Sequence, residues 1–268
     1  MGADRRRWGG CLTEILHALP DSGRASSRRR GAVAAAAAVL LAVLVAVVAA
    51  RRGAPFPCDI AVHRWFLSER NVSWTAAARR VTFTGTGAPP YALAAAAGAL
   101  AGAGRRGCWR GAVIGVLALA LAETVRLTLA TALARPRPPR ADWATAAGGA
   151  ALPSGHTTTS ALVAIGLAAA VLTYCHRWWT RVLACAVPAL WAVAVGVSRV
   201  YLGVHWPTDV LAGWLLATAL ACASLPRLTA VLRRLTGASA PTVPGGPCSE
   251  GDPAAGDRPP PSPPESRN

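Results

Sequence analysis

Two histidines in this chain of 268 residues lie next to groups that can bind an anion or move a proton. The stretch Ser198–Asp209 reads Ser-Arg-Val-Tyr-Leu-Gly-Val-His-Trp-Pro-Thr-Asp and carries a guanidinium, an imidazole and a carboxylate. Pro207 is suited to open a helix, because the first turn does not need its missing N–H. Asp209 would then reach back to His205 and fix the tautomer of its ring. The other ring nitrogen would be free as a nucleophile or base.

A second cluster, Pro153-Ser154-Gly155-His156, comes directly before an apolar run. Free backbone N–H groups at the start of a helix form an anion site, and Gly155 lets an oxyanion come close. A third cluster, Arg135-Pro136-Arg137-Pro138, ends the preceding apolar run with two cations. Arginine binds phosphate oxygens through paired hydrogen bonds. With Arg199 added, the three clusters predict a phosphate ester as the ligand.

These clusters resemble the motifs of the type-2 phosphatidic acid phosphatase (lipid phosphate phosphatase) superfamily, which shares its active site with vanadium haloperoxidases. The family motifs are Lys-x6-Arg-Pro, Pro-Ser-Gly-His and Ser-Arg-x5-His-x3-Asp. The second and third are present without change at residues 153–156 and 198–209. The resemblance covers residues 55–225. It implies a phosphatase that requires no metal and no other cofactor.

The resemblance also implies a role for each matched residue. His205, oriented by Asp209, attacks phosphorus and forms a phosphohistidine, while His156 protonates the leaving group and then activates water. Ser154 is expected both to cap its helix and to bind phosphate. The residues expected to hold the phosphate come from all three clusters: Arg135, Arg137, Ser154, Gly155 and Arg199.

The first motif departs from the family pattern. When Arg137 is aligned with the motif arginine, Ala130 takes the place of the lysine, and the whole chain contains no lysine. Arg126 lies one helical turn before Ala130 on the same face and is one candidate substitute for phosphate binding. Arg135 is the other. The alternative for Arg126 is an ion pair with Glu123, three residues earlier in the same span.

The composition is typical of a membrane protein. The chain is 53% hydrophobic and 15% charged, with a net charge of +16. In a soluble protein this charge would suggest nucleic acid. Here long apolar runs surround the arginines, which we interpret as membrane anchors and topology signals, so no nucleic-acid partner is expected. The expected partners are a lipid phosphate substrate and membrane lipids, and the oligomeric state stays open.

The apolar runs predict an all-α fold, a polytopic membrane bundle with about six transmembrane helices. One membrane domain (31–235) lies between a basic N-terminal tail (1–30) and a disordered tail rich in Pro, Gly and Ser (236–268). A cleaved signal peptide is the alternative for the first run, but the basic segment before it and the helices after it favour an anchor. The predicted spans are 31–50, 88–104, 111–134, 155–175, 182–197 and 207–225.

The arginines predict the topology. With the N-terminus inside, the basic segments 105–110, 176–181 and 227–234 are all cytoplasmic, as the positive-inside rule requires. All three motif clusters then lie outside. We therefore expect a cell-membrane protein with two cytoplasmic termini and an extracytoplasmic site. Segment 51–87 also carries arginines and conflicts mildly with the rule. It is predicted to form interfacial helices, with His63 on the surface and without a role.

Several lipids are compatible with such a site: phosphatidic acid, phosphatidylglycerol phosphate and polyprenyl diphosphate. Two other functions stay open. A vanadium-dependent haloperoxidase would use the same residues, but six spans argue against it. A non-catalytic protein that binds lipid phosphate is allowed by the missing lysine, but the intact His156, His205 and Asp209 argue against it. No cysteine or histidine spacing indicates zinc, and arginines around the site would repel a cation.

Overall fold

The computed structural model describes residues 22–102 and 104–236, and this part of the chain is helical. It contains eight α-helices, a short 3-10 helix (η1, Arg140–Asp142) and no strand. The all-α class predicted from the sequence is therefore confirmed for the described residues. The helices are α2 (Ser22–Ala50), α3 (Pro57–Ser68), α4 (Val72–Thr84), α5 (Ala88–Ala101), α6 (Gly104–Leu133), α7 (Gly155–Leu172), α8 (Trp178–Tyr201) and α9 (Pro207–Thr236).

Five of the helices, α2, α6, α7, α8 and α9, are long and apolar enough to cross a membrane. They correspond to five of the six predicted spans, and the chain is a multi-pass membrane protein. The remaining predicted span, 88–104, forms α5, which has only 14 residues. A helix of that length rises about 21 Å, less than the ~30 Å hydrocarbon core.

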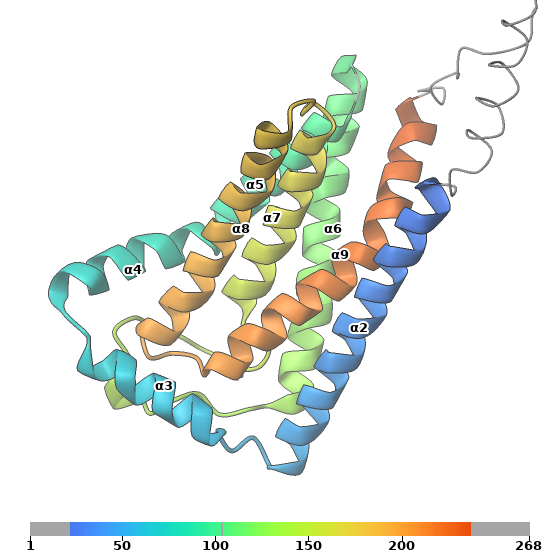
Figure 1. Cartoon of the computed structure of the whole chain (residues 1–268). Helices are drawn as coiled ribbons and strands as arrows, with labels where there is room; N and C mark the ends of the chain where they lie inside the picture. The colour runs from blue at the N-terminus through green and yellow to red at the C-terminus, as the bar shows by residue number, and fades with distance from the viewer. Residues whose placement is uncertain (1–21, 103, 237–268) are drawn as a thin grey trace, which may run out of the picture. The chain divides into compact units, whose positions relative to one another are not determined.

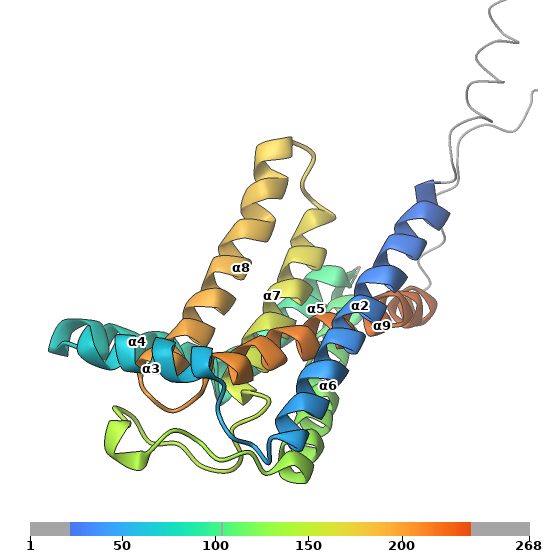
Figure 2. The same cartoon turned by 60° about the horizontal axis from the view of Figure 1, so that its bottom comes forward.

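The three motif clusters lie at the same end of these helices, which we call the motif end (Figure 1). Helices α2, α6 and α8 end there, whereas α5, α7 and α9 begin there. Helices α3 and α4 lie across this end (Figures 1 and 2). The start of α2 and the end of α9 lie at the opposite end. The alternation of helix direction thus brings sequence segments 135–138, 153–156 and 198–209 together.

The largest differences from the predicted helix boundaries are at the start of α2 and the end of α9. Helix α2 begins at Ser22, so residues 22–30, which were assigned to the basic tail, are helical. Arginine and alanine are good helix formers, and they extend the apolar helix without a proline to stop it. Helix α9 likewise continues past 225 to Thr236, through Pro226. The predicted tails at 1–21 and 237–268 lie outside the described residues and stay predictions.

Glycine allows α5 and α6 to touch. A Cβ on Gly98 would lie 2.0 Å from the carbonyl oxygen of Gly111, and a Cβ on Gly111 would lie equally close to the carbonyl of Gly98. No larger residue fits at either position without moving a backbone. Such close crossings through small residues are common between membrane helices, where packing takes the place of the hydrophobic effect. The contact fastens the short α5 to the long α6.

The segment before α7 is anchored in the helical core. Leu152 is completely buried, two residues before Ser154. It packs in an apolar cluster between α2 and α9, whose other buried members are Leu41, Val48, Ala212 and Leu216. A second buried cluster joins α7, α8 and α9 through Ala161, Ala164, Ala192 and Ala217. Apolar packing on both sides therefore holds the start of α7 in place, in addition to its polar contacts.

Candidate active site

The start of α7 is bonded to the start of α9. The backbone N–H of Ser154, the N-cap residue, donates to the carbonyl of Asp209 at 3.1 Å. Ser154 was expected to cap the helix with its side chain, but the hydroxyl makes no capping bond. It is completely buried and accepts a hydrogen bond from the hydroxyl of Thr157 at 3.0 Å. The predicted capping role is therefore wrong, because Thr157 engages the hydroxyl instead.

The turn between α8 and α9 presents His205. Gly203 begins the turn with φ of +73°, and a Cβ there would lie 2.4 Å from the carbonyl oxygen of Asp142. Only glycine meets both conditions. Arg199, in the last turn of α8, is buried and donates from Nη1 to the hydroxyl of Thr82 in α4 at 2.9 Å. Its Nε atom has no hydrogen-bond partner among the described residues.

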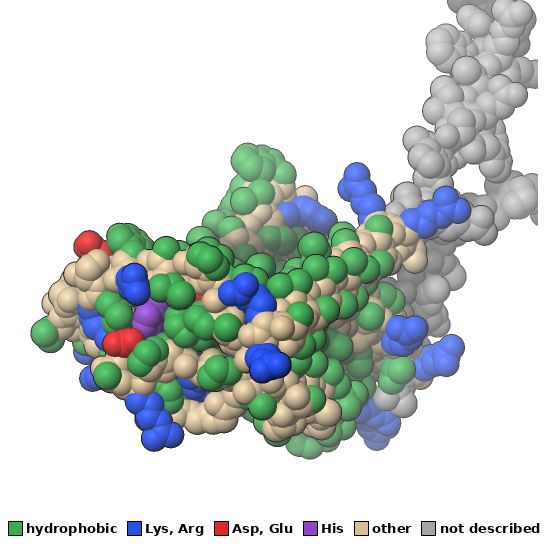
Figure 3. All heavy atoms as spheres, turned by 90° about the horizontal axis from the view of Figure 1, so that it is seen from below, with side chains coloured by type: hydrophobic (Ala, Val, Ile, Leu, Met, Phe, Trp, Pro, Cys, Tyr) green, Lys and Arg blue, Asp and Glu red, His purple; other side chains and the backbone are tan. Residues whose placement is uncertain are grey.

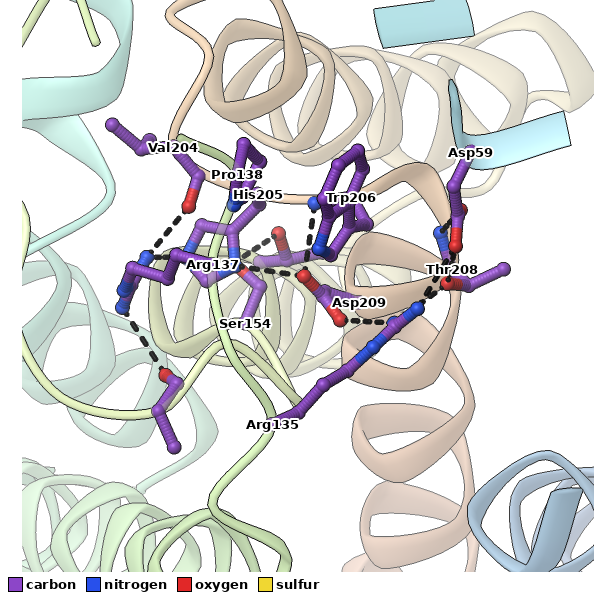
Figure 4. A network of polar contacts seen from close by, with 12 residues as sticks. Asp59, Arg135, Arg137, Pro138, Ser154, Val204, His205, Trp206, Thr208 and Asp209 are labelled. Carbon is purple, nitrogen blue, oxygen red and sulfur yellow. Dashed lines mark hydrogen bonds and ion pairs between the residues drawn. The ribbon is translucent and has the colours of Figure 1, made fainter. Parts of the chain in front are cut away.

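The two ring nitrogens of His205 have different neighbours (Figure 4). Nε2 lies 2.8 Å from Nη1 of Arg137, and Nδ1 lies 3.5 Å from Oδ2 of Asp209. A guanidinium can only donate, so Nε2 accepts this hydrogen bond with its lone pair. The proton of the neutral ring is then on Nδ1, facing the carboxylate. The separation of 3.5 Å is longer than a normal hydrogen bond, so Asp209 faces the ring without a tight bond.

The surroundings keep the His205 ring neutral. Burial lowers the pKa of His205 well below 6.5, and the charges of Arg137 and Arg199 lower it further. A backbone contact with Ala151 acts in the opposite direction. Burial also lowers the pKa of Arg137, while Asp209 raises it. A guanidinium nevertheless stays charged at physiological pH. The ring therefore presents a lone pair, rather than a proton, to a cation.

Arg137 is surrounded by neutral acceptors. Its Nε donates to the carbonyl of Gly149 at 3.0 Å, and Nη2 donates to the carbonyls of Gly148 and Ala150 at 2.7 and 3.2 Å. Nη1 donates to the carbonyl of Val204 at 2.8 Å. These partners carry no net charge, so they leave the positive charge of Arg137 uncompensated. An anion could take the place of a carbonyl and gain a charge-assisted hydrogen bond.

Arg135 has a different environment from the one predicted. Its guanidinium contacts two carboxylates, Asp59 at 2.9 Å and Asp209 at 2.5 Å, and all three side chains are completely buried. It also donates to the hydroxyl of Thr208 at 2.7 Å and to the carbonyl of Gly53 at 3.3 Å. The structure therefore does not support phosphate binding by Arg135, because an anion would have to displace two buried carboxylates.

Asp59 was not singled out in the sequence. It accepts hydrogen bonds from the backbone N–H of Phe56, at 3.1 Å, and of Thr208, at 3.0 Å. The hydroxyl of Thr208 donates to it at 2.8 Å. One carboxylate thus bonds the first turns of α3 and α9, where helix dipoles favour negative charge. An acidic residue just after Pro57 was a visible signal for a helix start, but nothing in the sequence showed that it would be buried.

The PAP2 superfamily model matches residues 111–231 of this chain. The resemblance to the PAP2 superfamily is confirmed. An undecaprenyl-diphosphatase of Sulfolobus acidocaldarius is 42% identical over 66 residues, which are 25% of this chain and 28% of that protein. The chain therefore matches little more than a quarter of the length of this relative.

The fold is also that of a solved PAP2 protein. The crystal structure of a transmembrane PAP2-type phosphatidylglycerolphosphate phosphatase from Bacillus subtilis superposes with a TM-score of 0.60. The match covers 72% of this chain and 96% of that chain, at 22% sequence identity. At this identity the likeness shows the fold alone. All residues predicted for the site lie within the PAP2 region, 111–231, whereas Asp59 lies outside it.

Arg126 lies one helical turn before Ala130, which occupies the lysine position of the first PAP2 motif. The guanidinium forms an ion pair with Glu123, as the alternative predicted. It also lies at the start of α7, because a Cβ on Gly155 would be 3.4–3.6 Å from three of its atoms. Its Nε has no hydrogen-bond partner among the described residues. Its charge acts on both Arg137 and His205. Ala130 itself is buried, with 2% of its surface exposed.

His156 follows Gly155 in the first turn of α7, and the charges of Arg126, Arg137 and Arg199 all act on it. His205 is also close enough to interact with it electrostatically. The two histidines of the PAP2 motifs and the three arginines are therefore close enough at the motif end for their charges to interact. Among the described residues, no group of three or more His, Cys, Asp or Glu side chains could hold a metal ion.

The predicted surface position of His63 is wrong. The side chain is buried, and its Nε2 lies 3.0 Å from Oδ2 of Asp142. Its ring centroid lies 5.2 Å from that of Trp206, the residue that follows His205. Arg70 donates to the carbonyls of Asp142 and Tyr201 at 2.8 and 2.9 Å. These long-range contacts, which no local pattern in the sequence could indicate, fasten the loop at 138–152 to α3 and to the end of α8.

Proposed function

We propose that this PAP2 protein is a membrane phosphatase that removes phosphate from a lipid phosphate or diphosphate through a phosphohistidine. The observation that carries the proposal is the contact between Nε2 of His205 and Arg137. It supports a neutral ring whose lone pair points to a fixed cation. A phosphate attracted by Arg137 would lie next to this lone pair, in position for attack.

In the first step, Nε2 of His205 bonds to phosphorus, and the bond from phosphorus to the leaving oxygen breaks. His156 donates a proton to that oxygen, which leaves as a lipid alcohol or a lipid monophosphate. The phosphorylated ring keeps its proton on Nδ1 and becomes a cation, which the negative charge of Asp209 stabilises. In the second step, His156 takes a proton from water, and the hydroxide attacks phosphorus. The bond to Nε2 breaks and inorganic phosphate is released.

Three arginines, Arg137, Arg199 and Arg126, supply the positive charge that stabilises the equatorial oxygens in both steps. Arg126 takes the role of the motif lysine that is absent at Ala130. The N–H of Gly155 adds a backbone donor from the start of α7. The buried hydroxyl of Ser154 lies just behind it and contributes a further hydrogen bond. Because these cations supply the charge, the reaction is expected to proceed without a divalent ion.

A lipid substrate suits both the place and the lining of the site. A cavity of about 370 Å³ lies among α5, α6, α7 and α9, and its lining is mostly apolar. It extends along α6 to Ala122, one residue before Glu123. This cavity supports a substrate whose hydrocarbon chain lies inside the helices while its phosphate reaches Arg126. Phosphatidic acid, phosphatidylglycerol phosphate and polyprenyl diphosphate all have this form.

We place the motif end on the extracytoplasmic side, with both chain termini in the cytoplasm. The basic segments 105–110 and 176–181 belong to the opposite end, which supports this orientation. Seen from the motif end, basic side chains are scattered over a face on which hydrophobic side chains are interspersed with other atoms (Figure 3). Exposed ones on this side include Arg51, Arg52, Arg64, Arg79 and Arg80. They run against the positive-inside rule and would suit anionic headgroups.

The decisive experiment measures phosphate release from several purified lipid phosphates in detergent with EDTA. Wild type is compared with His205→Ala and with His176→Ala, a change to an exposed histidine between α7 and α8. We expect release by wild type and His176→Ala, and none above background by His205→Ala. Acid-labile phosphate on the protein should appear only where His205 is present. Equal release by wild type and His205→Ala would exclude His205 as the nucleophile.

The role of Arg126 is tested in the same phosphate-release assay. We expect Arg126→Ala to lower kcat/KM on the order of tenfold to a hundredfold, and Arg126→Lys to recover part of the loss. Arg106→Ala, which removes an exposed cation at the other end of α6, is the matched control. Unchanged turnover in Arg126→Ala would remove this residue from the site and leave the first motif without a substitute for its lysine.

One observation favours a non-catalytic lipid-phosphate binder as a second candidate: the lysine of the first motif is absent, with Ala130 in its place. A binder would retain lipid phosphate in a pull-down and release no inorganic phosphate in the same assay. Orthovanadate distinguishes a phosphatase from the haloperoxidase alternative. A phosphatase is inhibited by this phosphate analogue, whereas a haloperoxidase oxidises halide with peroxide only when vanadate is added.

A further inference from the structure

Three buried charged side chains form a row beside His205, which we call the charge chain: Asp59, Arg135 and Asp209 (Figure 4). Arg135 contacts Asp59 through Nη2 at 2.9 Å and Asp209 through Nη1 at 2.5 Å. None of the three side chains has any exposed surface. Asp209, at one end, faces Nδ1 of His205 at 3.5 Å. Asp59, at the other end, belongs to α3 and lies outside the PAP2 region.

The charges within the charge chain do not cancel. Two carboxylates share one guanidinium, so the three groups together carry one excess negative charge when all are ionised. An excess buried charge is costly unless something compensates it. Hydrogen bonds from Phe56 and Thr208 supply part of the compensation at Asp59, and the backbone N–H of Trp206 donates to Asp209 at 2.9 Å. Two further groups near Asp209 can offset the excess: Arg137, with which Asp209 interacts electrostatically, and the ring of His205 when it becomes a cation.

We propose that Asp59 is a positioning residue that acts on His205 through Arg135 and Asp209. It draws part of the guanidinium charge toward itself and so leaves Asp209 with negative charge to offer the ring. That charge is needed when Nε2 bonds to phosphorus, because the ring is then a cation. This inference rests on the proposed function and assigns a role in it to a residue that the PAP2 motifs do not include.

The structure also allows a simpler role, in which Asp59 only joins α3 to α9. Hydrogen bonds from the backbone of Phe56 and from Thr208 fit that role. Asparagine has the same size as aspartate and keeps one acceptor oxygen, so it preserves much of such a joint while removing the charge. The substitution Asp59→Asn therefore separates the two roles, since only a charge role predicts a change in the chemistry of His205.

The expected pH effect follows from the groups around the ring. Arg137, Arg199 and Arg126 act on His205 from the phosphate side, and His156 lies with them. Asp209 faces the ring from the other side. In Asp59→Asn the electrostatic potential at the ring becomes more positive, because Arg135 then pairs with Asp209 alone. Protonation of the ring becomes harder, so the acid limb of the kcat/KM profile should move to lower pH.

The test measures phosphate release, its pH profile and inhibition by orthovanadate for wild type, Asp59→Asn and Asp59→Glu. For Asp59→Asn we expect kcat to fall on the order of tenfold with KM within about twofold, as for one unit charge removed near the ring. Inhibition by orthovanadate should weaken in parallel. Asp59→Glu, which keeps the charge, should recover at least part of the lost kcat. The matched control is Asp142→Asn, a carboxylate that contacts His63 and lies outside the charge chain.

A kcat and an acid limb that stay at wild-type values in Asp59→Asn would overturn the inference, even if the thermal midpoint falls. So would equal kcat losses in Asp59→Asn and Asp142→Asn. If Asp59→Asn does not fold, Asp59→Glu decides between the two roles. A kcat near the wild-type value supports the charge role, and a kcat tenfold below it overturns that role. The proposed function fails separately, when wild type and His205→Ala release phosphate equally in the same assay.

Discussion

Arg135 and Arg137 are separated by one proline, yet they lie on opposite sides of the His205 ring in opposite electrical surroundings. Arg135 lies between two buried carboxylates, on the Nδ1 side. Arg137 lies among backbone carbonyls and the ring itself, on the Nε2 side. One cation is more than neutralised by its direct partners, whereas the direct partners of the other carry no net charge. Residue type alone is therefore a poor guide to role here, because the two arginines differ in the charge of their partners.

The same comparison indicates where an anion can bind. A phosphate can take the place of the carbonyls around Arg137, since it offers a stronger acceptor to the same donors. It cannot take the place of Asp59 or Asp209 without leaving a buried carboxylate unpaired. We therefore expect the Nδ1 side to be a fixed support and the Nε2 side to bind the substrate. Variants of the two arginines should separate stability from activity.

The largest effect on stability is expected from Arg135→Met. Removing the guanidinium leaves Asp59 and Asp209 buried without their shared cation, which typically costs about 3–5 kcal/mol. We expect a large fall in the free energy of unfolding, measured by thermal or denaturant unfolding in detergent. If Arg135→Met instead keeps wild-type stability and loses only phosphate binding, the arginine belongs to the site, as the sequence alone suggested.

Arg137→Gln should show the reverse pattern. Losing a preorganised cation at a developing charge typically lowers the rate by about 10²–10³. The freed carbonyls of Gly148 and Gly149 lie at an exposed part of the loop and can bind water, so stability should change by less than about 1 kcal/mol. Phosphate release and unfolding are measured on the same sample. A stability loss as large as that of Arg135→Met would show that both arginines are structural.

Much of the fold was visible in the sequence because a membrane span is a local property. Runs of about twenty apolar residues predicted α2, α6, α7, α8 and α9. The sequence was less informative where neighbours decide the outcome. Alanine and glycine in segment 88–104 predicted a full span, but α5 stops at Ala101 and is fastened to α6 through Gly98. Helix ends such as Ser22 depend on capping and solvent rather than on hydropathy.

The candidate site shows the same limit. Intact motifs located His156, His205 and Asp209, and spacing placed Asp209 one turn from His205. Partners that are distant in the chain could not be predicted. Arg135 meets Asp59 across 76 positions, and His63 meets Asp142 across 79. Both pairs exist because α3 lies across the motif end, an arrangement that no local pattern records.

The neutral state of His205 has a consequence for stability against pH. Its pKa is lowered in the folded protein, so between that pKa and about 6.5 the unfolded chain binds more protons than the folded one. Stability therefore rises with pH in this window and falls on acidification, by up to about 1.4 kcal/mol per pH unit. We expect wild type to lose unfolding free energy between pH 7 and pH 5.

The control for this pH effect is a comparison of two histidines. His205→Gln should reduce the slope of the stability profile between pH 7 and pH 5, because it removes a buried group that resists protonation. His176→Gln, at an exposed position, should leave the slope as it is in wild type. The assignment is wrong if both variants keep the wild-type slope. In that case the acid sensitivity arises elsewhere, and the ring is not held neutral by its position between Arg137 and burial.

The smallest expected effect concerns the Nε2 side alone. A Cβ on Gly155 would lie 3.4 Å from Cζ of Arg126, in ordinary contact with the flexible end of a side chain. Gly155→Ala should therefore keep its stability within about 0.5 kcal/mol. The methyl group occupies space next to the backbone donor that is meant for an oxyanion, so kcat/KM and vanadate inhibition should weaken about threefold to tenfold.

Gly31→Ala, at an exposed position in α2, is the control, because its new Cβ would meet nothing within 4 Å and lies outside the candidate site and the apolar cavity. It should leave activity unchanged and keep or slightly raise stability, as alanine favours helices over glycine. If Gly155→Ala loses stability and keeps its affinity for vanadate, Gly155 serves packing and not the phosphate. The phosphate on the Nε2 side would then be bound by side chains alone, and Arg126 would be the first of these side chains to test.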